Sequence, residues 1–128
     1  MKVVINSCYG GFDLSAAGVR RYAEHAGLTL YPFSNDFKTG EWTPVGWDEA
    51  DNEFLPFYVS NKNCPDKTIF PVRDIPRDDE ALILTVQELG MRASGKFANL
   101  QIIEIPDDVD WEVEEYDGNE WIAEKHRT

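Results

Sequence analysis

Residues 6–15 have the types and spacing that could bind a small anionic ligand. A glycine pair, Gly10 and Gly11, stands between a predicted strand and a predicted helix, and at least one should have a positive φ or leave room for close backbone approach. Backbone N–H groups at such a turn can bind an anion, and the start of the helix adds partial positive charge. The candidate ligand-binding residues of this segment are Asn6, Cys8, Tyr9, Gly10, Gly11, Phe12 and Ser15.

The aromatic side chains of this segment, Tyr9 and Phe12, could stack on a base or a sugar. The segment matches neither a P-loop nor a dinucleotide-binding fingerprint. A structural turn therefore stays open as the alternative, with both rings in the core and Ser15 as an ordinary helix cap. Cys8 also has two interpretations, as a nucleophile activated by the helix start or as a small core residue.

A second segment, residues 73–79, concentrates positive charge in an otherwise acidic chain. Its Arg73 and Arg77 suit a phosphate or a carboxylate, because the guanidinium fork binds both groups through paired hydrogen bonds. This segment also joins a predicted strand to a predicted helix, so the two segments could lie side by side and form one ligand site. The alternative is that both arginines pair with the neighbouring aspartates and only fix the loop.

The sequence contains no recognisable catalytic motif, so no catalytic residue is predicted and enzyme activity stays open. His126 joins the candidate ligand-binding residues, because an imidazole can act as an acid or a base near neutral pH. A small enzyme acting on a nucleotide or a sugar phosphate could combine His126 with Cys8, Asp78 or Asp79.

The length of 128 residues predicts one domain spanning residues 1–128. The net charge of −12 should repel nucleic acid, so no nucleic-acid partner is expected. No window is apolar enough for a membrane span and no secretory signal opens the chain, which predicts a cytoplasmic protein without a membrane partner. Its two cysteines should be reduced, and they lack the spacing of a zinc site, so no metal or cofactor is predicted. Homo-oligomerisation stays open.

The predicted elements place both segments between a strand and a helix. A strand, a glycine turn, a helix ended by Gly27 and a second strand predict a right-handed βαβ unit. We therefore expect an α/β or α+β fold with a mixed sheet of about five or six strands, two main helices and a C-terminal antiparallel hairpin. The predicted strands are 2–6, 28–33, 68–72, 100–105, 109–113 and 121–123, the helices are 15–26 and 79–94, and an irregular insert covers about 34–66.

Acidic residues alternate with apolar ones in residues 109–114, which predicts a half-buried strand with an acidic outer face. Carboxylates on such a face are spaced by about 7 Å and could imitate a row of phosphates. An ordinary solvated sheet face is the simpler interpretation of the same pattern.

Three motifs of the sequence resemble an uncharacterised family of small proteins common in bacterial viruses and prophages. They are N-x-C-Y-G-G-F from Asn6, R-D-I-P-R-D-D from Arg73 and E-Y-D-G-x-E-W-I-A-E-x-H-R from Glu115, whereas residues 34–66 have no counterpart. The resemblance brings no activity or catalytic residues. It implies a phage-encoded accessory protein that works in the cytoplasm of the host cell.

We therefore expect an accessory protein that binds a small phosphorylated or nucleotide-derived ligand. It could serve as a sponge that removes a host defence signal, a task that needs no general base. Two alternatives stay open: a small enzyme acting on a nucleotide or sugar phosphate, and an acidic protein inhibitor that mimics nucleic acid.

Overall fold

The computed structural model of the chain describes residues 1–9, 11–52, 56–108 and 110–124. These residues form two α-helices and seven strands, so the expected α+β class with two main helices and a C-terminal antiparallel hairpin is confirmed. The helices are α1 (Ala16–Ala26) and α2 (Glu80–Leu89). The strands are β1 (Lys2–Asn6), β2 (Tyr31–Asn35), β3 (Trp42–Pro44), β4 (Phe57–Val59), β5 (Leu100–Glu104), β6 (Trp111–Tyr116) and β7 (Asn119–Glu124).

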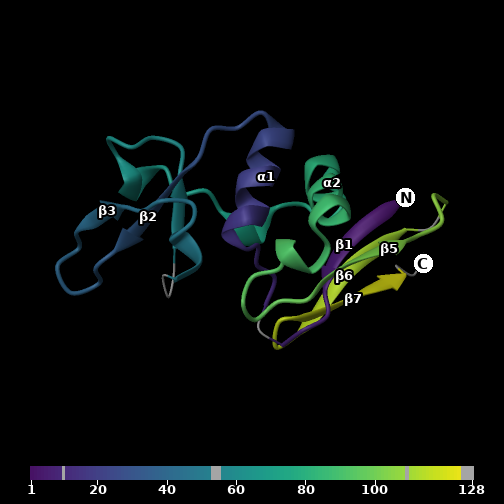
Figure 1. The fold of residues 1–128 in the computed structure, drawn as a ribbon. Helices are drawn as coiled ribbons and strands as arrows, with labels where there is room; N and C mark the ends of the chain where they lie inside the picture. Colours follow the sequence, from purple (N-terminus) through teal and green to yellow (C-terminus); the bar gives the residue numbers. More distant parts are fainter. Residues whose placement is uncertain (10, 53–55, 109, 125–128) are drawn as a thin grey trace.

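The strands form three small antiparallel sheets instead of the expected mixed sheet. They are the pair β1–β5, the three-stranded sheet β3-β2-β4 and the hairpin β6–β7. In Figure 1 the two helices lie in the middle, with β2 and β3 at one end and β1, β5, β6 and β7 at the other. The predicted βαβ unit is wrong, because β1 pairs with β5 and α1 leads the chain away to a different sheet.

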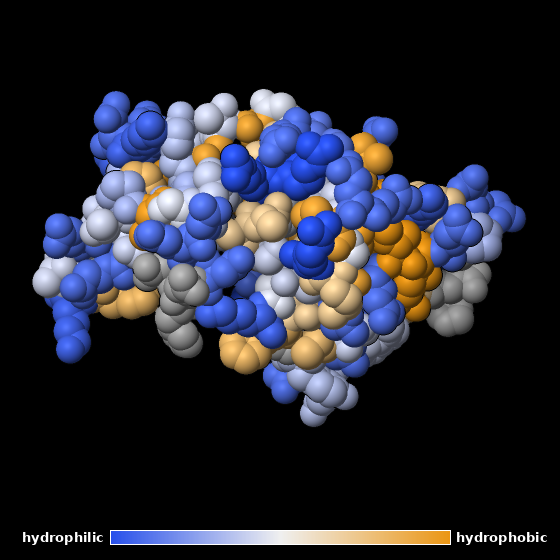
Figure 2. Space-filling model, in the orientation of Figure 1, coloured by the Kyte–Doolittle hydropathy of each residue, from blue (hydrophilic) through white to orange (hydrophobic). Residues whose placement is uncertain are grey.

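Strand β1 is buried on both faces, and this explains its uninterrupted apolar sequence. Val4 lies in the main core with Val19 of α1 and Leu82 of α2. The neighbouring side chains belong to a smaller core between the β1–β5 pair and the hairpin, so β1 is the middle layer of the structure. The smaller core and its border comprise Val3, Ile5, Ile103, Ile105, Trp111 and Ile122. In the space-filling view, the largest apolar area lies over the end that holds β1 and β5 (Figure 2).

The predicted helix starts are confirmed, and one predicted helix end is wrong. The Ser15 hydroxyl caps α1 and the Asp79 carboxylate caps α2, each accepting a hydrogen bond of 3.0 Å from a backbone N–H in the first turn. Gly27 ends α1 with φ +71°, as expected. Helix α2 ends at Leu89, because Gly90 has φ +58° and a 3₁₀ turn follows.

The predicted irregular insert contains short regular elements. Strands β3 and β4 flank β2 within it, and 3₁₀ turns connect them. The strand predicted at 68–72 is not formed: only a single bridge joins Ile69 to Val59, and Pro71 leads into a 3₁₀ turn at Val72–Asp74. Because this segment is irregular, Arg73 lies on a loop that faces the N-terminal turn.

The edge of β1 that does not pair with β5 is covered by a buried ion pair. The Val4 N–H donates to the Arg77 carbonyl at 2.8 Å, and the Asn6 N–H donates to Glu120 Oε1 at 3.0 Å. Arg77 in turn donates from Nε and Nη2 to the two Glu120 oxygens at 3.1 and 2.8 Å. The two side chains are only 14% and 6% exposed, so the pair joins β1, the loop before α2 and the hairpin in a site with little water.

Replacing Glu120 with alanine should lower the free energy of unfolding by about 3–5 kcal/mol, because the Arg77 guanidinium would stay buried without its counter-charge. Urea denaturation followed by tryptophan fluorescence measures the loss. Glu112→Ala is the matched control, since Glu112 is exposed on β6 opposite Ala123, and should change stability by less than about 0.5 kcal/mol. Equal stability of the two variants would contradict the anchoring role of the ion pair.

Candidate functional site

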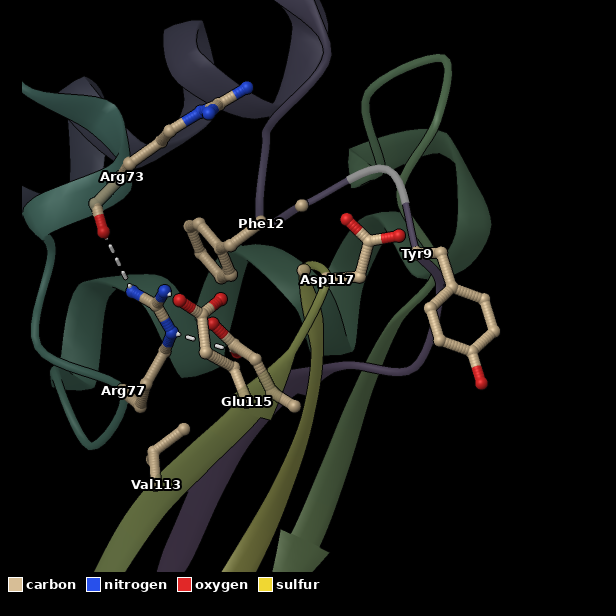
Figure 3. A pocket seen from close by; sticks show the side chains of 10 residues that line it. Tyr9, Phe12, Arg73, Arg77, Val113, Glu115 and Asp117 are labelled. Atoms are coloured by element: carbon tan, nitrogen blue, oxygen red, sulfur yellow. Dashed lines mark hydrogen bonds and ion pairs between the residues drawn. The ribbon is translucent and has the colours of Figure 1, made fainter.

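A cavity of about 600 Å³ lies where three segments meet (Figure 3). They are the N-terminal turn around Gly11, the arginine loop (residues 73–79) and the C-terminal hairpin β6–β7. The arginine loop supplies only its two arginines, whereas the other two segments supply both polar and apolar walls. The cavity is lined by Tyr9, Gly11, Phe12, Arg73, Arg77, Val113, Glu115, Asp117, Gly118 and Glu120.

The structure brings five of the ten predicted ligand-binding residues to this cavity. Of the others, Gly10 and His126 lie outside the described residues. Ser15 caps α1, and Cys8 is a half-buried free thiol that does not line the cavity. The five lining residues are Tyr9, Gly11, Phe12, Arg73 and Arg77.

Asn6 is fully buried and its side chain is used within the protein. Its Nδ2 donates to the carbonyls of Cys8 and Gly118 at 2.7 and 2.8 Å, and its Oδ1 accepts from the Asn99 N–H at 2.8 Å. Both donors of the amide are used and the side chain is out of reach of a ligand, so Asn6 ties β1 to the hairpin turn.

Arg77 and Phe12 also serve the fold. The Arg77 guanidinium lies 3.6 Å from the centre of the Phe12 ring, and that ring is only 3% exposed. Arg77 Nη1 donates to the carbonyls of Arg73 and Ile75, while its other donors bind Glu120. The alternative that Arg77 pairs with the neighbouring aspartates is therefore wrong, because its partner is a glutamate of the hairpin.

Arg73 differs from Arg77 in every respect that matters for a ligand. Its side chain is exposed and points away from Arg77 (Figure 3). Its guanidinium makes no hydrogen bond or ion pair with any residue that the structure describes. It lies 3.9 Å from the position that a Cβ on Gly11 would occupy, so it reaches over the N-terminal turn.

The N-terminal turn has the predicted positive φ, but the space beside its backbone is occupied by the hairpin turn. Gly11 has φ +89°, as predicted. The hairpin turn has positive φ at Asp117 and Gly118, and a Cβ on Gly118 would lie 2.5 Å from Gly11 N and 2.8 Å from Tyr9 O. Glycine at position 118 therefore allows the two turns to touch.

Gly118→Ala should cost about 1–3 kcal/mol of stability, because alanine is strained at this φ and its Cβ would meet backbone atoms. Urea denaturation again gives the value, and amide exchange should show faster opening of β6–β7. Gly46→Ala is the control, since an added Cβ there meets nothing within 4 Å and Gly46 is not among the positive-φ glycines. Unchanged stability of Gly118→Ala would show that the turns need not touch.

Three carboxylates of the cavity, Glu115, Asp117 and Glu120, are not among the site residues that the sequence predicts. The acidic outer face was expected to hold the acids of this strand, and Glu112 and Glu114 are indeed exposed there. Glu115 breaks that pattern, because it shares the inner side of β6 with Val113 and pairs in register with Glu120. Extending the two-residue alternation from Trp111 to position 115 would have found it.

The cavity offers a ligand two exposed carboxylates and one guanidinium that has no partner among the residues described. Arg77 is neutralised by Glu120, whereas Arg73, Glu115 and Asp117 line the same cavity without a bond between them among the described residues. Burial raises the pKa of the nearby Asp13 carboxyl, and the positive charge of Arg73 partly opposes that rise. The site is therefore of mixed charge and is not a purely basic phosphate pocket.

Asp13→Asn should raise the thermal midpoint at pH 7. Because folding raises the pKa of Asp13, ionisation of this carboxyl lowers the stability of the folded protein. The stabilising contribution of the protonated carboxyl is complete below the ordinary pKa near 3.8 and is lost as pH rises through the raised pKa. The gain should therefore shrink on acidification toward about pH 3, in thermal melts at several pH values. Asp74→Asn, which removes an exposed charge from the arginine loop, should show no such gain.

No family model, curated protein or solved structure matches the chain. Within the described ranges, no helix is long and apolar enough to cross a membrane. The same ranges contain no group of three or more His, Cys, Asp or Glu side chains that could hold a metal ion.

Proposed function

We propose that the protein binds a small phosphorylated ligand of the nucleotide class in the cavity between the N-terminal turn, the arginine loop and the hairpin. The ligand phosphate lies against Arg73, and its sugar hydroxyls donate to Glu115 and Asp117. The observation that carries the proposal is the exposed Arg73 guanidinium, which has no hydrogen-bond partner in the described part of the chain and lines the same cavity as the carboxylates of Glu115 and Asp117.

The arginine supports an anionic group in the ligand. A guanidinium can donate two parallel hydrogen bonds to a phosphate, and no protein carboxylate competes for Arg73 through a direct bond among the described residues. The loop that carries Arg73 is held in place, since the Arg73 carbonyl accepts a hydrogen bond of 3.1 Å from Arg77 Nη1. Binding therefore requires little ordering of the backbone.

The carboxylates support hydroxyl groups in the same ligand. Ionised Glu115 and Asp117 can only accept hydrogen bonds, and acidic side chains bind ribose hydroxyls in this way in dinucleotide-binding folds. Free phosphate would be repelled by them, whereas a sugar phosphate offers donors to the carboxylates and charge to the arginine. Tyr9 is 63% exposed where the cavity opens and gives a base a face to stack on.

Binding without chemistry has the better support of the two small-molecule hypotheses. Of the residues that an enzyme could have used, Asp79 is engaged as the cap of α2 and Cys8 does not line the cavity. We therefore propose sequestration of the ligand. The resemblance to small phage proteins makes a sponge for a host defence signal the biological use that we propose.

The nucleic-acid-mimic hypothesis has less support. It requires a continuous row of carboxylates, but Glu112 and Glu114 stand opposite Ala123 and Trp121 on the partner strand. The acidic row is thus confined to one strand of the hairpin, with an exposed indole beside it.

Isothermal titration with a panel of mononucleotides, dinucleotides and inorganic phosphate tests the proposal. At least one nucleotide should bind with a Kd below about 10 μM, more tightly than phosphate, and should be recovered unaltered after denaturation of the protein. Arg73→Gln should weaken that binding at least about tenfold without lowering the thermal midpoint. Lys38→Gln, which removes an exposed positive charge from the β2–β3 loop, should bind like the wild type.

Absence of binding below that limit, or full affinity in Arg73→Gln, would refute the proposal. Recovery of a chemically altered nucleotide would favour the enzyme alternative.

A further inference from the structure

A second cavity of about 420 Å³ lies beside the first, and Arg73 lines both. The N-terminal segment also runs along both cavities, since Phe12 lines the first and Asp13 lines the second. The remaining walls of the second cavity come mainly from β4 and from the segment before the arginine loop, with single residues of the N-terminal segment and of the arginine loop. They are Leu14, Pro56, Phe57, Tyr58, Ile69, Phe70, Pro71, Val72 and Asp74.

The second cavity differs from the first in chemistry. Apolar and aromatic side chains form most of it, and Tyr58 is held in place by stacking on Trp47 with ring centres 5.6 Å apart. Its partly buried charged group is the Asp13 carboxyl, whose Oδ1 accepts from the Leu14 N–H at 3.0 Å. Asp13 Oδ2 has no hydrogen-bond partner in the described part of the chain and lies beside Gly95, 2.6 Å from the position of an added Cβ, so this oxygen keeps its capacity to accept a hydrogen bond.

A flat ring with apolar faces and an N–H donor on its edge fits these walls. A nucleobase has both features, because its faces stack on apolar and aromatic groups and its edge carries N–H donors. An N–H donor at Asp13 would also compensate the cost of keeping that carboxylate partly buried. Sugar hydroxyls, by contrast, find their acceptors on the other side of Arg73, at Glu115 and Asp117.

We infer that the ligand site continues past Arg73 into the second cavity, and that its ligand is of the dinucleotide class, with bridging phosphate between two nucleoside groups. The inference rests on the proposed function. The bridging phosphate lies on Arg73, the sugar of one nucleoside lies against Glu115 and Asp117, and the base of the other enters the cavity beside Asp13. A mononucleotide occupies only the first cavity.

Titration with AMP and with diadenosine compounds that contain one or two bridging phosphates tests the inference. The better bridged compound should bind at least about tenfold more tightly than AMP, because its second nucleoside is held at high effective concentration. Ile69→Trp fills the second cavity and should reduce the affinity of the bridged compound to that of AMP, with AMP binding unchanged. Leu28→Trp is the matched control, since both side chains are 42% exposed and Leu28 lies outside both cavities.

The outcomes separate the inference from the proposed function. Equal affinity for AMP and the bridged compounds, or no effect of Ile69→Trp on either, overturns the second subsite and leaves nucleotide binding in the first cavity standing. Loss of AMP binding in a folded Ile69→Trp protein overturns the assignment of the two subsites. If neither AMP nor a bridged compound binds the wild type, the proposed function fails and the inference fails with it.

Discussion

The buried ion pair between Arg77 and Glu120 is the interaction on which the rest of the structure depends. Removing two charges from water is costly, and the cost is offset only when their hydrogen-bonding capacity is satisfied. Here the guanidinium also donates to the carbonyls of Arg73 and Ile75, while the carboxylate also accepts from the Asn6 N–H. The pair thus joins three segments that no sheet connects and gives the unpaired edge of β1 a partner.

The same ion pair gives the two arginines different roles. Arg77 lies against Phe12 and donates its hydrogen bonds to protein groups, whereas the side chain of Arg73, four residues earlier, lines the cavity. Because Arg77 holds the Arg73 carbonyl at 3.1 Å, it also fixes the loop from which Arg73 extends. Position along one short loop therefore separates a structural charge from one that is available to a ligand.

Local features of this fold could be predicted from the sequence, because neighbouring residues determine them. The caps at Ser15 and Asp79, the stop at Gly27 and the Asp-Gly hairpin turn depend on side chains within a few positions. The pairing of β1 could not be predicted: a strand that is buried on both faces has no two-residue alternation to indicate its neighbours. Its observed partner lies almost a hundred residues away.

For the candidate site too, features set by neighbouring residues could be predicted and contacts between distant segments could not. The glycines and arginines of the sequence predict the two loops that border the site, whereas the acidic alternation predicts only a separate surface for the hairpin that completes it. The partner of Arg77 is 43 residues distant, and nothing near Arg77 distinguishes it from Arg73. Glu115 could have been predicted as a cavity residue, since the two-residue alternation that places Trp111 and Val113 on the inner side of β6 continues to Glu115.

The contact between the hairpin turn and the N-terminal turn has a consequence for how the protein folds. The Asn6 side chain bonds to the Gly118 carbonyl across 112 positions, so the wall that they form requires closure of nearly the whole chain. Contacts of such sequence separation carry the largest loop-closure entropy and tend to form late in folding. A folding intermediate in which α1 and α2 are already packed would still lack the cavity, and so ligand affinity belongs to the fully closed chain.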